Sequence, residues 1–273
     1  MYRIFKAIRF FYNQIKLADY GGLFLQGCRN RGCLFLCYNF VSVKTKQNYQ
    51  SLNHIKIMET TTNTQKEVKE VYNLIILDRS GSMSSIQGQA IAGVNETIGT
   101  IRAAGKENNL PQKVTITSFC GCSINDFCKN TDVTDVPIMS AEDYQPCCST
   151  PLYDAMGQSL TALRETIKNR TDVAVSVTII TDGYENSSKK WSAPQIKALV
   201  ELLKADGWLF AYIGANQDLY EIKQNLAIDN TMDFCCSEAG TVAMFQKERK
   251  SRTAWMKKVK ECDPNANSNY FSF

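Results

Sequence analysis

The sequence predicts a Rossmann-like, doubly wound α/β fold, with a mostly parallel sheet and helices on both faces. Three observations predict it. Short apolar runs alternate with amphipathic segments over about 190 residues. The runs are nearly continuous, as strands buried on both faces require, and two of them end directly at an aspartate. With 44% hydrophobic residues, 21% charged residues, 15 Gly and 6 Pro in 273 positions, the chain is neither collagen-like nor low-complexity nor wholly disordered.

The first 57 residues differ in composition from the rest of the chain. They hold nine Lys or Arg and one acid, Asp19, whereas the remaining residues hold 22 bases and 26 acids. We expect residues 1–57 to be a basic, aromatic- and Cys-rich leader that is not a folded domain, with Met58 as the natural start. The predicted segments after it are a polar linker at 58–70, the folded domain at 71–260 and a tail at 261–273.

Two other interpretations of the leader stay open. Its basic, aromatic start could lie on an anionic membrane surface as an amphipathic helix, although no apolar run is long enough to span a bilayer. Cys28, Cys33 and Cys37 loosely resemble the cluster-binding loop of radical S-adenosylmethionine activases. Each gap between these cysteines is one residue longer than in that family, and no barrel is predicted after them.

Strands are predicted where apolar runs end at a polar turn. The run VYNLIIL stops at Asp78, and the strongest run, VAVSVTIIT, stops at Asp182. A short strand after Gly121 pairs with the preceding one as an antiparallel hairpin, and the last strand lies at an edge of the sheet. The predicted strands are residues 71–77, 113–119, 124–129, 173–181, 208–213 and 231–235.

Helices are predicted where apolar residues recur every three or four positions between these strands. Ser85 caps the first helix, Pro151 starts the second, and Ser192 and Pro194 begin the third. The apolar stripes of the first two are Ile86, Ala90, Val94, Ile98 and Ile101, and Leu152, Ala155, Met156, Leu160, Leu163 and Ile167. Two more helices are expected, at 218–226 and at 239–260, the latter carrying Val242, Phe245 and Trp255.

Polar residues gather where the predicted strands end. In open α/β sheets ligands bind outside the carboxyl ends of the strands, so the side chains after the first and the strongest strand should share one site with the turn at Pro151. The oxygen-bearing side chains there are Asp78, Ser80, Ser82, Thr150 and Asp182. Carboxylate and hydroxyl oxygens suit Mg²⁺. His54 is the single histidine. This count argues against Ser-His or Cys-His catalysis and against a His-rich zinc site.

The spacing of these residues resembles a known metal site. The DRSGS sequence at residues 78–82, the later Thr150 and the TDG turn at residues 181–183 resemble the three parts of the metal-ion-dependent adhesion site (MIDAS) of von Willebrand factor A (VWA) domains. That family includes the inserted domains of integrins. The similarity covers about residues 70–260, and it implies a sheet with one antiparallel edge strand.

The resemblance also implies a role for each residue. Ser80 and Ser82 would ligate the ion directly, and Asp78 would hold it directly or through water. Thr150 would join the shell in the ligand-occupied state, and Asp182 would contribute through water or directly. The sixth position would stay open for a glutamate or aspartate of a partner protein.

We therefore expect a Mg²⁺-dependent protein-binding module, with Mn²⁺ as a substitute, and no enzymatic activity. Its partner would present an exposed Asp or Glu, and the resemblance permits an AAA ATPase. Tyr184 and Glu185, next to Asp182, are candidates for partner contact. The absence of a recognisable secretion signal and the many cysteines favour a cytoplasmic location. The mildly acidic folded part argues against nucleic-acid binding, and no membrane span is predicted.

Two functions of other classes remain as alternatives. Asp78 after a buried strand also resembles the nucleophile of haloacid-dehalogenase-type phosphotransferases, although Ser80 stands where that family has a second acid. An extracellular adhesin would need a targeting segment and a disulfide pattern. Taken singly, each predicted ligand could also be an ordinary turn or cap residue.

The 11 cysteines are expected to be reduced thiols, because an odd total and adjacent pairs such as Cys147–Cys148 fit a disulfide framework poorly. A zinc site from Cys120, Cys122 and Cys128 is a further option, although paired two-residue spacing is missing. The Cys147–Cys148 pair lies just before a predicted ligand, so its oxidation could disturb the metal site.

Overall fold

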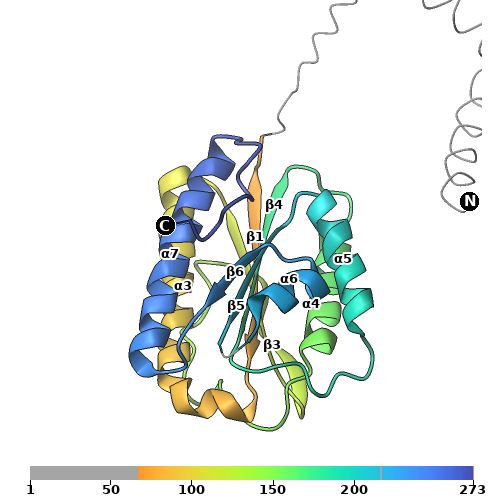
Figure 1. Ribbon diagram of the computed structural model, residues 1–273. Coiled ribbons are helices and arrows are strands. Elements are labelled where there is room, and N and C mark those ends of the chain that lie inside the picture. Colours follow the sequence, from red (N-terminus) through yellow and green to blue (C-terminus); the bar gives the residue numbers. More distant parts are fainter. Residues whose placement is uncertain (1–66, 216, 273) are drawn as a thin grey trace, which may run out of the picture. The chain divides into compact units, whose positions relative to one another are not determined.

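A six-stranded sheet runs through the part of the chain that the computed structural model describes, residues 67–215 and 217–272 (Figure 1). The strand order is β3-β2-β1-β4-β5-β6, with β1 between β2 and β4. The strands are β1 (Glu70–Asp78), β2 (Gln112–Cys120), β3 (Ser123–Asp132), β4 (Val173–Thr181), β5 (Leu209–Gly214) and β6 (Asn230–Asp233). The predictions for the leader, including its cysteines and His54, lie outside the described residues.

The strand directions confirm the predicted sheet. β1 pairs in parallel with both β2 and β4, and β5 and β6 continue the parallel arrangement. β3 runs antiparallel to β2 and forms one edge, and β6 forms the other. The central strands are buried along nearly their whole length, which explains why their sequences are continuous apolar runs rather than alternating ones.

Helices cover both faces of the sheet, and each face has its own apolar core (Figure 1). α3 and α7 pack on one face, and α4, α5 and α6 pack on the other. The predicted stripes of α3 and α4 are buried, as their helical spacing requires. The helices are α3 (Gln87–Asn108), α4 (Leu152–Thr166), α5 (Ala193–Ala205), α6 (Leu219–Leu226) and α7 (Glu238–Lys260).

One local prediction about a helix start was wrong. Ser85 does not cap α3, because a 3₁₀ helix, η1 (Gly81–Ile86), leads directly into α3 and supplies its first turn. The Ser85 hydroxyl instead donates to the Ser82 carbonyl at 3.4 Å. Val242 of α7 is 46% exposed, because the face that α7 buries is centred on other residues, Phe245 and Trp255 among them.

A buried charged network attaches α7 to the sheet. Arg252 is fully buried, and its guanidinium contacts Glu248 at 2.7 Å on the same helix. It also donates to Asn73 Oδ1 of β1 at 2.9 Å and to Thr178 Oγ1 of β4 at 2.8 Å. The Tyr270 hydroxyl, beyond α7, donates to Glu248 at 3.1 Å. α7, whose sequence is rich in charged residues, is therefore held to the central strands by charge-assisted hydrogen bonds.

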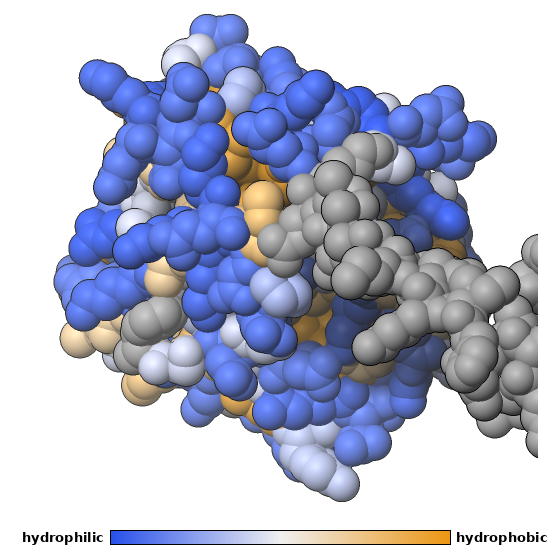
Figure 2. All heavy atoms as spheres, turned by 90° about the horizontal axis from the view of Figure 1, so that it is seen from above, coloured by the Kyte–Doolittle hydropathy of each residue, from blue (hydrophilic) through white to orange (hydrophobic). Residues whose placement is uncertain are grey.

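The end of the molecule where β1 begins is mostly hydrophilic, with small, separate apolar areas (Figure 2). Within the described ranges, none of the helices combines the length and apolarity needed to cross a membrane.

Candidate metal centre

The sheet brings together loops that are far apart in the sequence. β1 and β4 are parallel neighbours with Leu77 opposite Ile180, so Asp78 and Asp182 both emerge at the same edge of the sheet. They are separated by about a hundred residues along the chain. The third loop precedes α4 and carries Thr150.

A chain of hydroxyl and carboxylate oxygens links the first and last of these loops. The hydroxyl oxygens of Ser80 and Ser82 lie 3.1 Å apart. The Ser82 hydroxyl donates to Asp182 Oδ1 at 2.7 Å. Ser82 is exposed, whereas Ser80 and Asp182 are buried, so the cluster opens to solvent on the Ser82 side.

Asp78 lies at the base of this cluster and is fully buried. One carboxylate oxygen accepts from the Ser80 N–H at 2.7 Å, and the other accepts from the Thr181 hydroxyl at 2.6 Å. Burial raises the pKa of Asp78 to about 6 against the lowering effect of these bonds, and the charge of Asp182 adds to the increase. A cation at this point would therefore offset both burial and repulsion.

Thr150 lies beside the same cluster, and its hydroxyl and that of Ser82 both lie close to Gly183. A Cβ atom built on Gly183 would lie 3.7 Å from both the Ser82 hydroxyl oxygen and the Thr150 hydroxyl oxygen. Thr150 is buried, and its N–H donates to Asn186 Oδ1 at 2.8 Å, which ties its loop to the segment after β4. The five predicted ligands thus occupy one region of the molecule.

The donor chemistry of this region fits a hard divalent cation. The contributing atoms are hydroxyl and carboxylate oxygens from three loops, and Mg²⁺ and Mn²⁺ prefer oxygen ligands. Ser82 is exposed, so its side of the cluster is the one from which a further ligand could approach.

The two predicted partner-contact residues differ in their surroundings. The Glu185 carboxylate accepts from the Tyr153 and Ser187 N–H groups, each at 2.8 Å, and from both the N–H and the hydroxyl of Ser188, each at 2.7 Å. Glu185 therefore connects its own loop to the start of α4. Tyr184 is 50% exposed, and its hydroxyl accepts from the Asp218 N–H at 2.9 Å.

Sequence reasoning missed residues that support the centre from outside. The fully buried Tyr144 donates its hydroxyl to the backbone carbonyl of Asp78. Cys236 Sγ lies 3.7 Å from Asp182 Oδ2, and its only sequence signal was its position just after the last edge strand. Tyr144 follows no strand and sits on no helical stripe, so no pattern in the sequence points to it.

The expectation of reduced thiols was wrong for one pair of cysteines. Cys122 and Cys148 form a disulfide that connects the β2–β3 turn to the loop before α4. The proposed Cys120–Cys122–Cys128 grouping was also wrong, because Cys128 points into the core, toward the Val114 carbonyl. Cys128 pairs with Ile116, four positions along β2 from Cys120, so distance along the strands separates it from the turn.

No protein-family model and no curated protein matches the sequence. Among solved structures, the chain is similar to the pilus adhesin SpaC from Lactobacillus rhamnosus GG, with 17% identity and a TM-score of 0.52, over 69% of this chain and 31% of SpaC. It is also similar to the SpRpn10 VWA domain, with 12% identity and a TM-score of 0.47, over 66% of this chain and 95% of that domain. A third similar structure is manganese-loaded TRAP of Plasmodium vivax, with 15% identity and a TM-score of 0.44, over 64% of this chain and 72% of TRAP.

The chain has the mostly parallel, doubly wound α/β fold that the sequence predicts. The mostly parallel six-stranded sheet, the single antiparallel edge strand among the described residues and the flanking helices are the arrangement that the sequence resemblance implied. At these identities the likeness concerns the fold alone. The match spans less than a third of SpaC, so it says nothing of the remainder of that protein.

Proposed function

We propose that this chain is a metal-dependent protein-binding module. Asp78, Ser80, Ser82, Thr150 and Asp182 would hold one Mg²⁺ or Mn²⁺ ion. The bound ion would supply a positive charge with an open coordination position, which an Asp or Glu side chain of a partner protein would fill. An AAA ATPase is one partner class that can be tested.

The observation that carries this proposal is the convergence of oxygen atoms from three distant loops. The Ser80, Ser82 and Asp182 side chains form a continuous chain of hydrogen bonds. The Ser82 and Thr150 hydroxyls both lie close to Gly183. Ordinary turn residues would bond to their own backbone instead. Here the Ser82 hydroxyl bonds to a residue 100 positions away.

The charge of the site explains why binding would depend on the metal. Without a cation, Asp78 and Asp182 present negative charge and would repel a partner carboxylate. A divalent ion held by these side chains would offset their negative charge and bind the partner carboxylate at its open coordination position. A chelator should therefore abolish partner binding, and added Mg²⁺ should restore it.

The phosphotransferase alternative receives less support from the geometry. A nucleophilic aspartate needs a carboxylate oxygen that can reach a substrate. Asp78 is fully buried, and both of its oxygens are engaged, by Ser80 and by Thr181. The position suits an anchor beneath a cation better than a nucleophile.

A cytoplasmic location is part of the proposal. Six cysteines among the described residues are unpaired, which fits a reducing compartment. The disulfide favours the adhesin alternative instead. A membrane-impermeant thiol reagent applied to intact cells distinguishes the two, because a cytoplasmic chain is labelled only after lysis and an adhesin is labelled at once.

Thermal unfolding with Mg²⁺ and with a chelator tests the metal site. An ion that binds only the folded state should raise the melting temperature, corresponding to about 2.7 kcal/mol at a hundredfold excess over its Kd. Asp182→Ala should remove this increment. Asp206→Ala is the matched control, because Asp206 is an exposed acid beyond α5, ahead of β5, and should leave the increment intact. Equal increments in all three proteins would contradict the proposal.

A further inference from the structure

Four cysteines meet beside the candidate metal centre. Cys120 and Cys122 flank Gly121 at the turn between β2 and β3, and Cys147 and Cys148 lie in the loop before α4. The two segments are in tight contact at Gly121. Its N–H donates to the Ser149 carbonyl at 2.7 Å, and a Cβ atom on Gly121 would lie 2.2 Å from the Ser149 hydroxyl oxygen.

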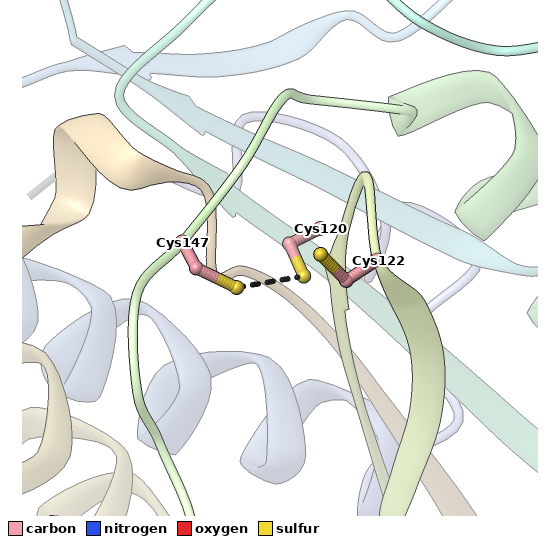
Figure 3. A group of neighbouring side chains, drawn as sticks. All are labelled: Cys120, Cys122 and Cys147. Atoms are coloured by element: carbon pink, nitrogen blue, oxygen red, sulfur yellow. Dashed lines mark hydrogen bonds between the residues drawn. The ribbon is translucent and has the colours of Figure 1, made fainter.

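The sulfur atoms of this cluster converge. Cys120 Sγ and Cys147 Sγ lie 3.4 Å apart, and the sulfurs of Cys120, Cys122 and Cys147 all lie within 4.8 Å of one another. Figure 3 shows the Cys120 sulfur between those of Cys147 and Cys122. Cys148 is bonded to Cys122, so the fourth sulfur lies next to that of Cys122.

These separations suit a tetrahedral thiolate site. Zn–S bonds of about 2.3 Å place the sulfurs of a tetrahedral zinc site roughly 3.8 Å apart. The Cys120–Cys147 separation of 3.4 Å is slightly below that value, and the sulfurs of Cys120, Cys122 and Cys147 all lie within 4.8 Å of one another. Four cysteines from two segments, two on each, are also the ligand number that a closed structural zinc site requires.

The surroundings favour thiolate at one of these positions. The Arg79 guanidinium lies 3.8 Å from Cys147 Sγ and donates to the Ser123 hydroxyl, next to the β2–β3 turn, at 2.7 Å. Positive charge beside the cluster lowers the free energy of the deprotonated, metal-binding form.

We propose that Cys120, Cys122, Cys147 and Cys148 bind one Zn²⁺ ion in the reduced protein. The Cys122–Cys148 disulfide is the metal-free, oxidised form of the same site. A dithiol or phosphine reductant supplies the two electrons that cleave the S–S bond. The ion then replaces the protons of the thiols, which pass to solvent. This site is separate from the oxygen-lined centre and takes a softer metal.

A metal at this site would connect the segments that carry the candidate ligands of the oxygen-lined centre. The Gly81 N–H donates to the Cys148 carbonyl at 3.0 Å, and the Cys147 N–H donates to the Arg79 carbonyl at 2.9 Å. The loop that carries Cys147 and Cys148 is therefore hydrogen-bonded to the turn that carries Ser80. It also leads directly into Thr150, so a fixed loop would fix two parts of the oxygen-lined centre.

Co²⁺ titration of the full chain, reduced with a phosphine, tests the proposal. Tetrahedral thiolate-bound cobalt gives a sulfur-to-metal charge-transfer band and intense visible bands, whereas cobalt at an oxygen-lined site gives neither. We expect these bands to saturate at one equivalent and to disappear on adding Zn²⁺. They should be lost in Cys120→Ser and in Cys147→Ser, and in wild-type protein whose Cys122–Cys148 disulfide is intact.

Matched variants separate this site from other metal-binding groups. The bands should persist in Cys235→Ser, an exposed cysteine outside the cluster, and in the Cys28→Ser/Cys33→Ser/Cys37→Ser leader variant. They should also persist in Asp182→Ala, so failure of the oxygen-lined centre and failure of this site are distinguishable. Circular dichroism confirms that each variant is folded. Absence of the bands from reduced wild-type protein, or their persistence in folded Cys120→Ser, would overturn the proposal and leave a thiol–disulfide pair without a metal.

Discussion

At the scale of single residues, Asp154 shows how a helix residue can organise a loop in another part of the chain. It lies in the first turn of α4, and its carboxylate accepts from three consecutive N–H groups, those of Lys189, Lys190 and Trp191, at 2.8–2.9 Å. Burial raises its pKa, but these bonds and the Lys190 charge outweigh burial, so the pKa of Asp154 lies below its usual range.

This depressed pKa predicts a pH-dependent contribution to stability. Because the folded-state pKa is lower than the unfolded one, the contribution is present above the unfolded pKa of about 3.9 and is lost as pH falls through the folded value. Asp154→Asn should lower the free energy of unfolding at pH 7 by about 1–3 kcal/mol. Urea unfolding of both proteins should show the difference shrinking in acid. A difference that is constant with pH would contradict this account.

The candidate ligands were predictable one residue at a time because each follows a recognisable signal. Asp78 and Asp182 come directly after buried apolar runs, and Thr150 precedes a helix that begins after a proline. The residues that support them were not predictable. Tyr144 donates to the Asp78 carbonyl, and Glu185 bonds to its own loop and to α4, through contacts that exist only after folding.

At the scale of elements, α3 and α7 pack closely because one helix carries a glycine at the contact. A Cβ atom built on Gly93 of α3 would lie 2.0 Å from the ring of Phe245 on α7. Gly99, on the same helix, would meet nothing within 4 Å. The two glycines therefore separate the effect of packing from the effect of helix propensity.

Alanine at these two positions should change stability in opposite directions. Gly93→Ala overpacks the contact with Phe245 and should cost about 1–3 kcal/mol. Gly99→Ala should stabilise the protein by about 0.5–1 kcal/mol, because alanine favours a helix interior over glycine. Chemical denaturation measures both. A stabilising Gly93→Ala would show that α7 does not pack on α3 through Phe245.

Element boundaries were predicted well where burial on both faces determines the sequence and less well at helix starts. The predicted strand at 173–181 coincides with β4, since every position of that run fits a buried strand. The start of α3 was wrong because a 3₁₀ turn and a capped helix start look alike in sequence.

At the scale of the whole molecule, the buried Arg252 joins α7 to two central strands and, through Glu248, to Tyr270 near the end of the described chain. Nothing in the sequence distinguishes this pair from the exposed charges of the same helix. Charge alone predicts a solvated side chain, and only the packed fold supplies Asn73 and Thr178 as partners.

Breaking this network should be far more costly than breaking a surface pair. Arg252→Met leaves Glu248 buried without its partner and should cost about 3–5 kcal/mol, whereas Arg252→Met/Glu248→Met should recover much of that loss. Lys257→Met removes the exposed contact with Glu261 and should change stability by less than about 1 kcal/mol. Thermal and denaturant unfolding of the three variants tests the order. Similar losses for Arg252→Met and Lys257→Met would contradict it.

Mn²⁺ binding measured by electron paramagnetic resonance tests most directly whether oxygen atoms from three loops hold one divalent cation. Bound Mn²⁺ loses the sharp signal of the free ion. In a Cys120→Ser/Cys147→Ser background, which removes the thiolate cluster, the chain should bind one Mn²⁺ that Mg²⁺ displaces. Adding Ser80→Ala and Asp182→Ala should abolish that binding, and adding Asp206→Ala should not. Equal Mn²⁺ binding with and without Ser80 and Asp182 would contradict the account.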